Sequence, residues 1–222
     1  MTHELSNFCG VLLAGGQSRR MGGGDKCLRP LGGRPLLARI IERARPQVGP
    51  LVINANGDPT RFEAFELPVV PDSIGGFAGP LAGVLTGMEW AREHAPDCPW
   101  IVTFAGDAPF FPQDLVARLA QAREHEGADI VCAASGGRDH PVFALWPVAL
   151  ADSLRAAMEA GVRKVDVFTA DHRFARVDWP VEPYDPFFNA NRPDDWAEAE
   201  RLFGSEAVEG AEPRAAQPGG KA

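Results

Sequence analysis

Short apolar runs alternate with amphipathic segments along most of the chain. The run F-C-G-V-L-L at Phe8 to Leu13 ends at glycines, which predicts a buried strand. Further strands are predicted at residues 51–54, 67–70, 100–104, 130–133, 142–146 and 174–179. Apolar residues at helical spacing predict helices over residues 36–44, 80–92, 112–126, 148–160 and 193–203, with a short helical piece over 165–170.

This order predicts the fold class. Strands that are apolar throughout, rather than alternating, and that are separated by helices favour a mostly parallel sheet covered by helices on both faces. The expected fold is α/β, a three-layer sandwich. At about 150 residues per domain, a chain of 222 residues without an evident linker is predicted to form a single domain. We place that domain at residues 1–203. Because residues 204–222 have Val208 as their single large apolar residue, we expect a disordered tail there.

Composition and charge exclude several classes. Hydrophobic residues make up 45% of the chain and charged residues 23%, which is typical of a globular protein. No apolar window is long enough to span a membrane. The net charge of −8 disfavours binding to long nucleic acids. The four cysteines form no C-x-x-C pair and the N-terminus does not resemble a secretory signal, so we expect a cytoplasmic protein with buried thiols at Cys9 and Cys132.

Polar and glycine residues follow several predicted strands. Gly15, Asn54, Asp72 and Asp107 each stand at or just after a strand end. Open α/β sheets bind their ligands beyond the carboxyl ends of the strands. We therefore expect these residues to share one site, although Asn54 and Asp72 also fit ordinary turn chemistry.

The loop from Gly15 to Lys26 predicts a phosphate site. Its glycines let backbone N–H groups approach anionic oxygens, and Arg19, Arg20 and Lys26 add positive charge. It contains neither G-x-x-x-x-G-K-[ST] nor G-x-G-x-x-G, which disfavours a P-loop ATPase and a dinucleotide dehydrogenase. Asp107 would hold Mg²⁺ beside these phosphates, because Mg²⁺ prefers carboxylate and phosphate oxygens.

The loop L-A-G-G-Q-S-R-R-M-G-G-G-D-K at residues 13–26 resembles the signature of nucleoside triphosphate transferases. The segments V-I-N-A-N, P-D-S, G-P-L-A-G, G-D-A-P-F, R-D-H-P-V-F-A-L and F-N-A-N-R-P-D-D narrow the resemblance to molybdenum cofactor guanylyltransferases. They occur in the family's order between about residues 8 and 203. The resemblance implies a Rossmann-like domain that transfers GMP from GTP to the phosphate of molybdopterin. The products would be pyrophosphate and molybdopterin guanine dinucleotide.

The resemblance also implies roles for individual residues. The nucleotide-binding residues would be Leu13, Ala14, Gly15, Lys26, Asn54, Asp72 and Asp107. Arg20, Lys26 and Asp107 would be catalytic, with Asp107 as the Mg²⁺ ligand, while Asn189 and Asn191 would lie on the pterin side. Transfer between two anions needs charge stabilisation more than a strong base, which suits two cations and a metal ion.

Two alternatives remain open from the sequence. The chain could use CTP and make the cytosine dinucleotide, or be another nucleotidyltransferase, because base choice rests on a few loop contacts. It could also be a non-catalytic cofactor carrier, although a carrier needs neither Lys26 nor Asp107. The expected partners are GTP and molybdopterin, with transient contacts to molybdoenzymes and cofactor-handling proteins. We expect a monomer that binds neither nucleic acid nor a membrane.

Overall fold

The computed structural model describes residues 6–15, 25–75 and 79–209. A seven-stranded sheet forms its centre, in the order β5-β4-β1-β6-β8-β7-β9. The strands are β1 Phe8–Leu13, β4 Leu51–Asn54, β5 Val69–Val70, β6 Trp100–Ala105, β7 Ile130–Ser135, β8 Arg138–Pro147 and β9 Phe174–Trp179. Neighbouring strands are parallel except where β8 runs antiparallel to β6 and β7. The prediction of a mostly parallel sheet is confirmed.

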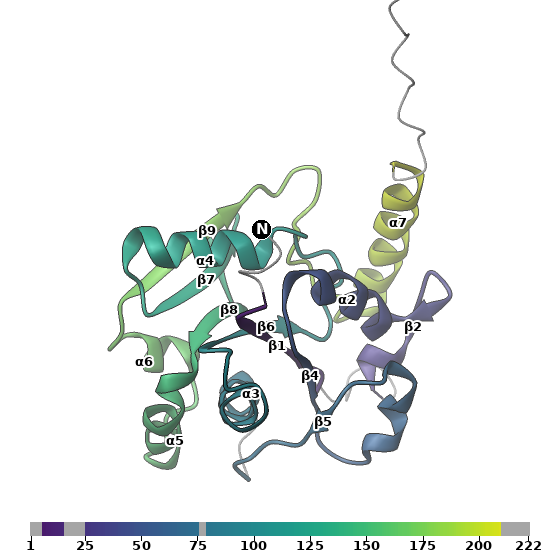
Figure 1. The fold of residues 1–222 in the computed structure, drawn as a ribbon. Coiled ribbons are helices and arrows are strands. Elements are labelled where there is room, and N and C mark those ends of the chain that lie inside the picture. Colours follow the sequence, from purple (N-terminus) through teal and green to yellow (C-terminus); the bar gives the residue numbers. More distant parts are fainter. Residues whose placement is uncertain (1–5, 16–24, 76–78, 210–222) are drawn as a thin grey trace, which may run out of the picture.

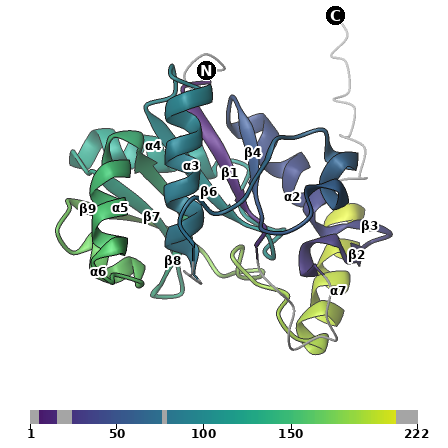
Figure 2. The same ribbon diagram turned by 90° about the horizontal axis from the view of Figure 1, so that it is seen from below.

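Helices cover both faces of this sheet (Figures 1 and 2). One face carries α2 Leu36–Ala44, α4 Leu115–Glu126 and α7 Pro193–Glu209. The other carries α3 Pro80–His94, α5 Ala151–Glu159 and α6 Val165–Thr169. Each face has its own hydrophobic core, with Leu37 and Leu115 in the first and Leu85 and Leu154 in the second. The arrangement is a three-layer α/β sandwich in one domain, as the sequence predicts.

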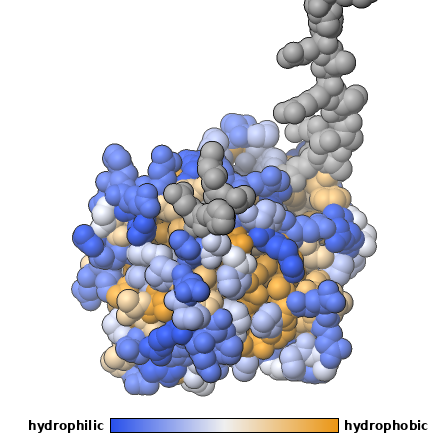
Figure 3. All heavy atoms as spheres, in the orientation of Figure 1, coloured by the Kyte–Doolittle hydropathy of each residue, from blue (hydrophilic) through white to orange (hydrophobic). Residues whose placement is uncertain are grey.

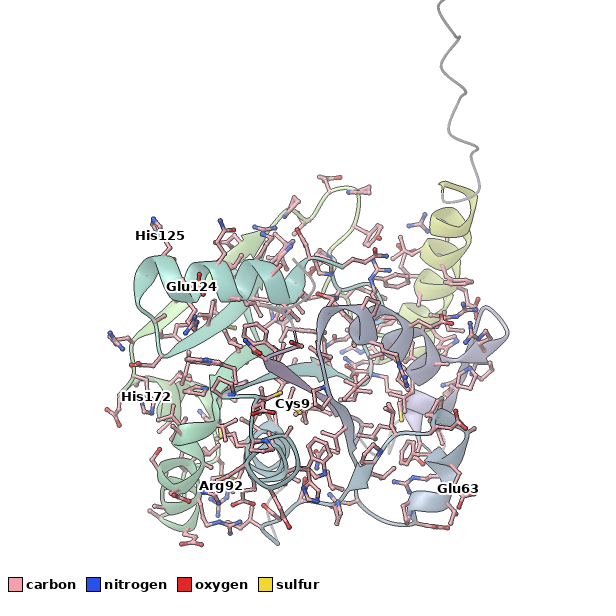
Figure 4. All side chains as sticks on the ribbon, viewed as in Figure 1. Cys9, Glu63, Arg92, Glu124, His125 and His172 are labelled. Carbon is pink, nitrogen blue, oxygen red and sulfur yellow. The ribbon has the colours of Figure 1, made fainter. Side chains whose placement is uncertain are left out.

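Helix α3 lies close to the centre of the sheet because its inner face carries glycines at Gly83 and Gly87 among larger apolar residues. A Cβ added at Gly87 would lie 2.5 Å from a methyl carbon of Val11 in β1, so a side chain there would push the helix outward. The buried thiol of Cys9 also packs on this side of β1 (Figure 4). Cys9, Cys27, Cys98 and Cys132 are all free and buried, which confirms the prediction for Cys9 and Cys132.

Several sequence-predicted boundaries are wrong. The strand predicted at 67–70 is only Val69–Val70, and the helix predicted from 112 begins at Leu115. The strand predicted at 142–146 extends over Arg138–Pro147, so R-D-H-P at residues 138–141 lies within β8. Gly136 and Gly137, with φ of 54° and 75°, form the tight turn that joins β7 directly to β8. The pattern of apolar residues does not reveal this turn because residues 138–141 are mostly polar.

The C-terminal helix is longer than predicted. The expected disordered tail begins at residue 204, but α7 continues to Glu209. Residues 210–222 lie outside the described part of the chain. The correction therefore concerns residues 204–209, and the prediction for the remainder stays open.

Several short elements between the main helices and strands are not predicted from the sequence. These are η1 Lys26–Leu28, the hairpin of β2 Pro30–Leu31 and β3 Arg34–Pro35, η2 Arg45–Gln47, η3 Pro59–Phe65 and η4 Val148–Leu150. They are too short to produce a hydrophobic period. Two of them, η1 and η3, border the cleft described below.

The surface of this domain is mainly hydrophilic in the view of Figure 3, around a smaller apolar area. Val167 and Val181 are the exposed large hydrophobic residues among those described. Within the described ranges, the structure contains no helix long and apolar enough to cross a membrane.

Candidate active site

A cleft of about 650 Å³ lies at the carboxyl ends of β1, β4 and β6. Strand β1 stands between β4 and β6, so the chain leaves it in one direction toward β4 and later returns to its other side. This is the topological switch point at which open α/β sheets bind ligands. The cleft is lined by Leu13, Ala14, Gly15, Asp25, Lys26, Cys27, Asn54, Asn56, Arg61, Asp72, Gly79, Pro80, Gly83, Ala105, Gly106, Asp107, Val142 and Asn189.

The floor of the cleft depends on a close approach of two strand ends. The N–H of Gly106 donates to the carbonyl oxygen of Leu13 at 3.0 Å. A Cβ at Gly106 would lie 2.7 Å from that same oxygen and 3.0 Å from Cα of Ala14. Glycine therefore lets the end of β6 lie against the end of β1 and places Asp107 beside the first loop.

Lys26 and Asp107 form an ion pair at this end of the cleft. Nζ of Lys26 lies 2.8 Å from Oδ2 of Asp107, and the two side chains are 10% and 29% exposed. The same ammonium donates to Oδ1 of Asn191 at 2.5 Å. A buried lysine needs such partners because an unpaired buried charge is costly. The contacts fix the ammonium of Lys26, the last residue of the phosphate loop predicted from the sequence, in the cleft.

The segment that carries Asn191 is built into the site through its backbone. The N–H of Ala190 donates to the carbonyl oxygen of Asp107 at 3.1 Å. The N–H groups of Asn191 and Arg192 donate to Oδ2 of Asp195 at 2.9 and 2.7 Å, where α7 begins. Residues more than 80 positions apart in the sequence thereby share one hydrogen-bonded unit.

A second polar group forms the opposite side of the cleft. Nδ2 of Asn54 donates to Oδ1 of Asp72 at 3.0 Å, and Nδ2 of Asn56 donates to Oδ2 of Asp72 at 2.8 Å. The N–H of Asp72 in turn donates to Oδ1 of Asn56 at 2.8 Å. Asn54 is 4% exposed, so its amide is held rigidly beside the cleft. These contacts bring together the ends of β4 and β5.

Arg61 and Asp25 are cleft residues that sequence reasoning missed. Nε of Arg61, in η3, lies 2.9 Å from Oδ2 of Asp25, which precedes η1. The guanidinium also donates to the carbonyl oxygen of Asn56. Asp25 belongs to the loop motif, which was a usable signal, whereas Arg61 lies in a segment without periodicity or motif.

The other predicted site residues are placed as follows. Leu13, Ala14 and Gly15 line the cleft. Gly79 and Pro80, at the start of α3, line it as well. Asn191 reaches the site through Lys26 rather than as a lining residue. The predicted catalytic Arg20 lies outside the described residues, as do residues 16–24 generally.

Cys27 lines the cleft but is not poised for chemistry. Burial, and then the negative charge of Asp25, raise the pKa of its thiol to about 12. The thiol is therefore protonated near neutral pH, and a thiol is neither the nucleophile nor the metal ligand that a thiolate is.

Oxygen ligands for a divalent cation are present beside Asp107. Oδ1 of Asn189 is buried without a hydrogen-bond partner, although the residue lines the cleft. A buried amide oxygen without a partner is costly unless a ligand satisfies it. Because a carboxylate and an amide oxygen suit a hard cation such as Mg²⁺, the donor set fits one. Within residues 6–15, 25–75 and 79–209, no three His, Cys, Asp or Glu residues cluster in a way that would hold a metal.

His125 and His172 are not part of the cleft. His125 lies on the outer face of α4 beside Glu124, and His172 lies near α6, remote from the switch point (Figure 4). Glu63 and Arg92 likewise lie at the periphery. The charged groups in the cleft are those of Asp25, Lys26, Arg61, Asp72 and Asp107, among the residues described.

Several known proteins are similar to this chain in sequence or in fold. A family model described as a MobA-like NTP transferase domain matches residues 10–173. A molybdenum cofactor guanylyltransferase of Rhodopseudomonas palustris (strain BisB5) is 58% identical over 193 residues, covering 86% of this chain and 92% of that protein. One from Bradyrhizobium sp. (strain ORS 278) is 56% identical over 198 residues, with 89% and 93% covered.

A solved structure agrees with these relatives. The crystal structure of molybdopterin-guanine dinucleotide biosynthesis protein A from Archaeoglobus fulgidus is similar, with a TM-score of 0.69 and 25% sequence identity. The match covers 89% of this chain and 99% of that one. The similarity therefore extends over nearly the whole described fold, including both sides of the cleft.

Proposed function

The chain belongs to the MobA-like NTP transferase family, and we propose that it transfers GMP from GTP to the terminal phosphate of molybdopterin. A phosphate oxygen of molybdopterin forms a bond to the α-phosphorus of GTP. The bond from that phosphorus to the oxygen bridging to the β-phosphorus breaks, and pyrophosphate leaves with the electron pair. The attacking oxygen is already anionic, so the step needs no general base. The product is molybdopterin guanine dinucleotide.

The observation that carries this proposal is the Lys26–Asp107 pair at the switch point of the sheet. The reaction brings one anion to another, and the negative charge grows on the leaving pyrophosphate. A fixed ammonium offsets that charge without reorganising during the reaction. Lys26 is held by two partners and lies at the loop predicted to bind phosphates, which suits this role. Arg20 would add a second cation and stays a prediction.

A magnesium ion would be held by Asp107, with Asn189 as a further oxygen ligand. When bound, Mg²⁺ neutralises phosphate charge and stabilises the departing pyrophosphate. Oδ2 of Asp107 accepts from Lys26, which keeps the carboxylate oriented toward the cleft. The same carboxylate would therefore contact both the ammonium of Lys26 and the magnesium ion.

The nucleotide would bind on the side of the cleft formed by β1, β4 and β5. Leu13, Ala14 and Gly15 line the cleft at the end of β1, and their backbone groups would contact the base and its ribose. Asn54 and Asp72 would present their amide and carboxylate groups, which are fixed by a mutual hydrogen bond, to the base and its ribose. A carboxylate can accept from both the N1–H and the N2 amino group of guanine, whereas cytosine offers its N4 amino group alone, which favours GTP over CTP at this position.

The acceptor would approach from the side of Asn189 and Asn191, next to Lys26. A cleft of about 650 Å³ falls within the usual size of small-molecule sites. The further expectations of a monomer, transient delivery to molybdoenzymes and a cytoplasmic location go with this role and are proposals of the same kind.

The direct test is pyrophosphate release by the purified protein with Mg²⁺ and molybdopterin, with GTP and CTP in parallel. Release with GTP and formation of the guanine dinucleotide is the expected result. Release with CTP alone would make the protein a cytidylyltransferase. Tight binding of nucleotide or cofactor without release under either condition would favour the carrier. Asp107→Asn serves as the inactive control, because it removes the charge and keeps the shape.

A further inference from the structure

Three polar side chains meet at the turn between β7 and β8, outside the residues given a role above. Oγ of Ser135, the last residue of β7, lies 2.7 Å from Nε2 of His140 in β8 and 2.8 Å from Oδ1 of Asp185. Ser135 is 2% exposed and His140 is 9% exposed. Asp185 belongs to the segment between β9 and α7. The turn at Gly136 and Gly137 brings Ser135 and His140 side by side.

The donors and acceptors in this cluster can be assigned in one consistent way. The Ser135 hydroxyl has a single hydrogen, which it donates to the carboxylate of Asp185. His140 must then donate from Nε2 to the hydroxyl oxygen. The N–H of Phe187 donates to the same Oδ1 at 3.0 Å. Because the hydroxyl lies between the imidazole and the carboxylate, His140 cannot take its proton, and the three do not form a hydrolase triad.

Aromatic packing holds the same segment. The His140 and Phe187 rings stack with centroids 4.6 Å apart and an interplanar angle of 29°. Phe187 packs against Phe143 at 5.1 Å and edge-on against Trp179 at 5.5 Å. Phe187 is 2% exposed, so its position is fixed by strands on both sides of it. Residues 185 and 187 are thus tied to the sheet by a carboxylate and a ring.

The residues that follow carry the polar groups of the cleft. Asn189 lines it with an unpartnered oxygen, and Ala190 bonds to the backbone of Asp107. Asn191 accepts from the Lys26 ammonium. Four residues after the attachment at Asp185, the chain therefore begins to shape the site. Asn54 and Asp72, on the opposite side, belong to β4 and the loop after β5 and share none of these contacts.

We propose that Ser135, His140 and Asp185 form an anchor that positions residues 189–191 at the acceptor side of the cleft. They are positioning residues, and losing them should impair use of molybdopterin more than use of GTP. The kinetic part of this inference rests on the proposed function. The structural part, that the anchor fixes residues 189–191, stands on the contacts themselves.

The kinetic experiment compares substitutions at Asp185 with a matched control. Asp185→Ala should lower kcat/KM for molybdopterin about tenfold and leave KM for GTP within about twofold. A tenfold change corresponds to about 1.4 kcal/mol. Asp185→Asn keeps an acceptor for Ser135 and for the Phe187 N–H and should remain close to wild type. Asp139→Ala removes the neighbouring carboxylate of β8, which pairs with Arg176 instead, and should also remain close to wild type. An equal loss in Asp139→Ala, or an equal effect on GTP, would overturn the proposal.

Hydrogen exchange tests the anchor without any activity. A peptide covering residues 186–192 should exchange faster in Asp185→Ala than in wild type and Asp185→Asn, because the Ala190 N–H loses its fixed acceptor geometry. Peptides from β1 and β6 should be unchanged. Equal exchange in all variants would refute the anchor. Ser135→Ala should give the same pattern, and it decides the matter if Asp185→Ala does not fold. A wild type that releases no pyrophosphate would instead overturn the proposed function, and the exchange result would still judge the anchor.

Discussion

A Cβ added at Gly83 would lie 2.4 Å from Oδ1 of Asn54, so the first turn of α3 and the end of β4 can meet only because Gly83 has no side chain. The same Cβ would lie 2.5 Å from Cδ2 of Leu13. Both neighbours line the cleft on the side assigned to the nucleotide. The glycine thus sets the width of the cleft where Asn54 reaches Asp72.

Gly83→Ala should therefore raise KM for GTP about tenfold, because Asn54 must shift away from Asp72. Alanine is the better helix former, so helix propensity does not predict a loss. Gly75→Ala is the control, since a Cβ there would meet nothing within 4 Å. Steady-state kinetics with GTP varied at saturating acceptor make the comparison. An unchanged KM in Gly83→Ala would show that Asn54 is not a nucleotide contact.

Asp107→Asn should reduce pyrophosphate release by about a thousandfold or more while the protein stays folded. The amide keeps an oxygen for Lys26 but loses the charge that would hold Mg²⁺ and balance the ammonium. Asp152→Asn, on a side chain that is 83% exposed and paired with Arg92, is the matched control. Circular dichroism checks the fold of both variants. Substantial turnover in Asp107→Asn would remove Asp107 from the mechanism.

Lys26→Ala should weaken use of GTP about a hundredfold, because it removes the ammonium that the predicted phosphate loop holds at the cleft. Removing it also leaves Asp107 without its charged partner and Asn191 without a donor. Lys26→Arg should restore little of the activity, since a guanidinium is larger and cannot fit a position that is 8% exposed. The measured quantity is kcat/KM for GTP, and a value close to wild type in Lys26→Ala would contradict the phosphate-loop assignment.

Much of this site is implied by the sequence, because its residues occupy strand ends that periodicity locates well. Asn54 ends one mainly apolar strand and Asp107 comes shortly after another, and the topology rule then brings them together. The contact between Asn191 and Lys26 does not follow from such a rule. It depends on the course of the chain between β9 and α7, where no periodic pattern exists.

The direction of β8 is a second feature that periodicity cannot supply. An apolar run predicts a buried strand equally well in either direction. The glycine pair before Arg138 is the local signal for a hairpin, and the antiparallel strand it starts places Ser135 beside His140. The place of Arg61 in the cleft cannot be predicted from the sequence for another reason: its ion pair with Asp25 joins two irregular segments.

The imidazole of His140 should make stability depend on pH. Burial lowers its pKa below the ordinary value, while Asp185 and Asp139 oppose this shift and Arg138 adds to it. A depressed pKa means that the folded state binds fewer protons than the unfolded state, so stability is present above the unfolded pKa of about 6.5 and is lost as the pH falls through the folded value.

Urea unfolding between pH 7.5 and 5 tests this expectation. The free energy of unfolding should fall more steeply in wild type than in His140→Gln, by up to about 1.4 kcal/mol per pH unit for one proton. Comparing slopes, rather than absolute stabilities, removes the constant cost of the substitution. Parallel slopes would show that His140 does not titrate differently on folding.

Helix α7 should be required for the site, whereas the residues beyond it should not. Phe203 lies against Gly32 and under the guanidinium of Arg39, and Glu200 accepts from the Gly32 N–H at 3.1 Å. Together with Asp195, which caps Asn191, these contacts tie α7 to the β2–β3 hairpin that follows η1 and Lys26.

A chain ending at residue 209 should therefore keep the melting temperature and kinetics of the full protein. A chain ending at residue 192 loses the buried Leu202 and the cap on Asn191, and it should melt at least about 10 °C lower and lose most transfer activity. Differential scanning calorimetry and pyrophosphate release measure both effects. A large loss on removing residues 210–222 alone would mean that this segment takes part in the fold or the reaction, against the expectation of a disordered tail.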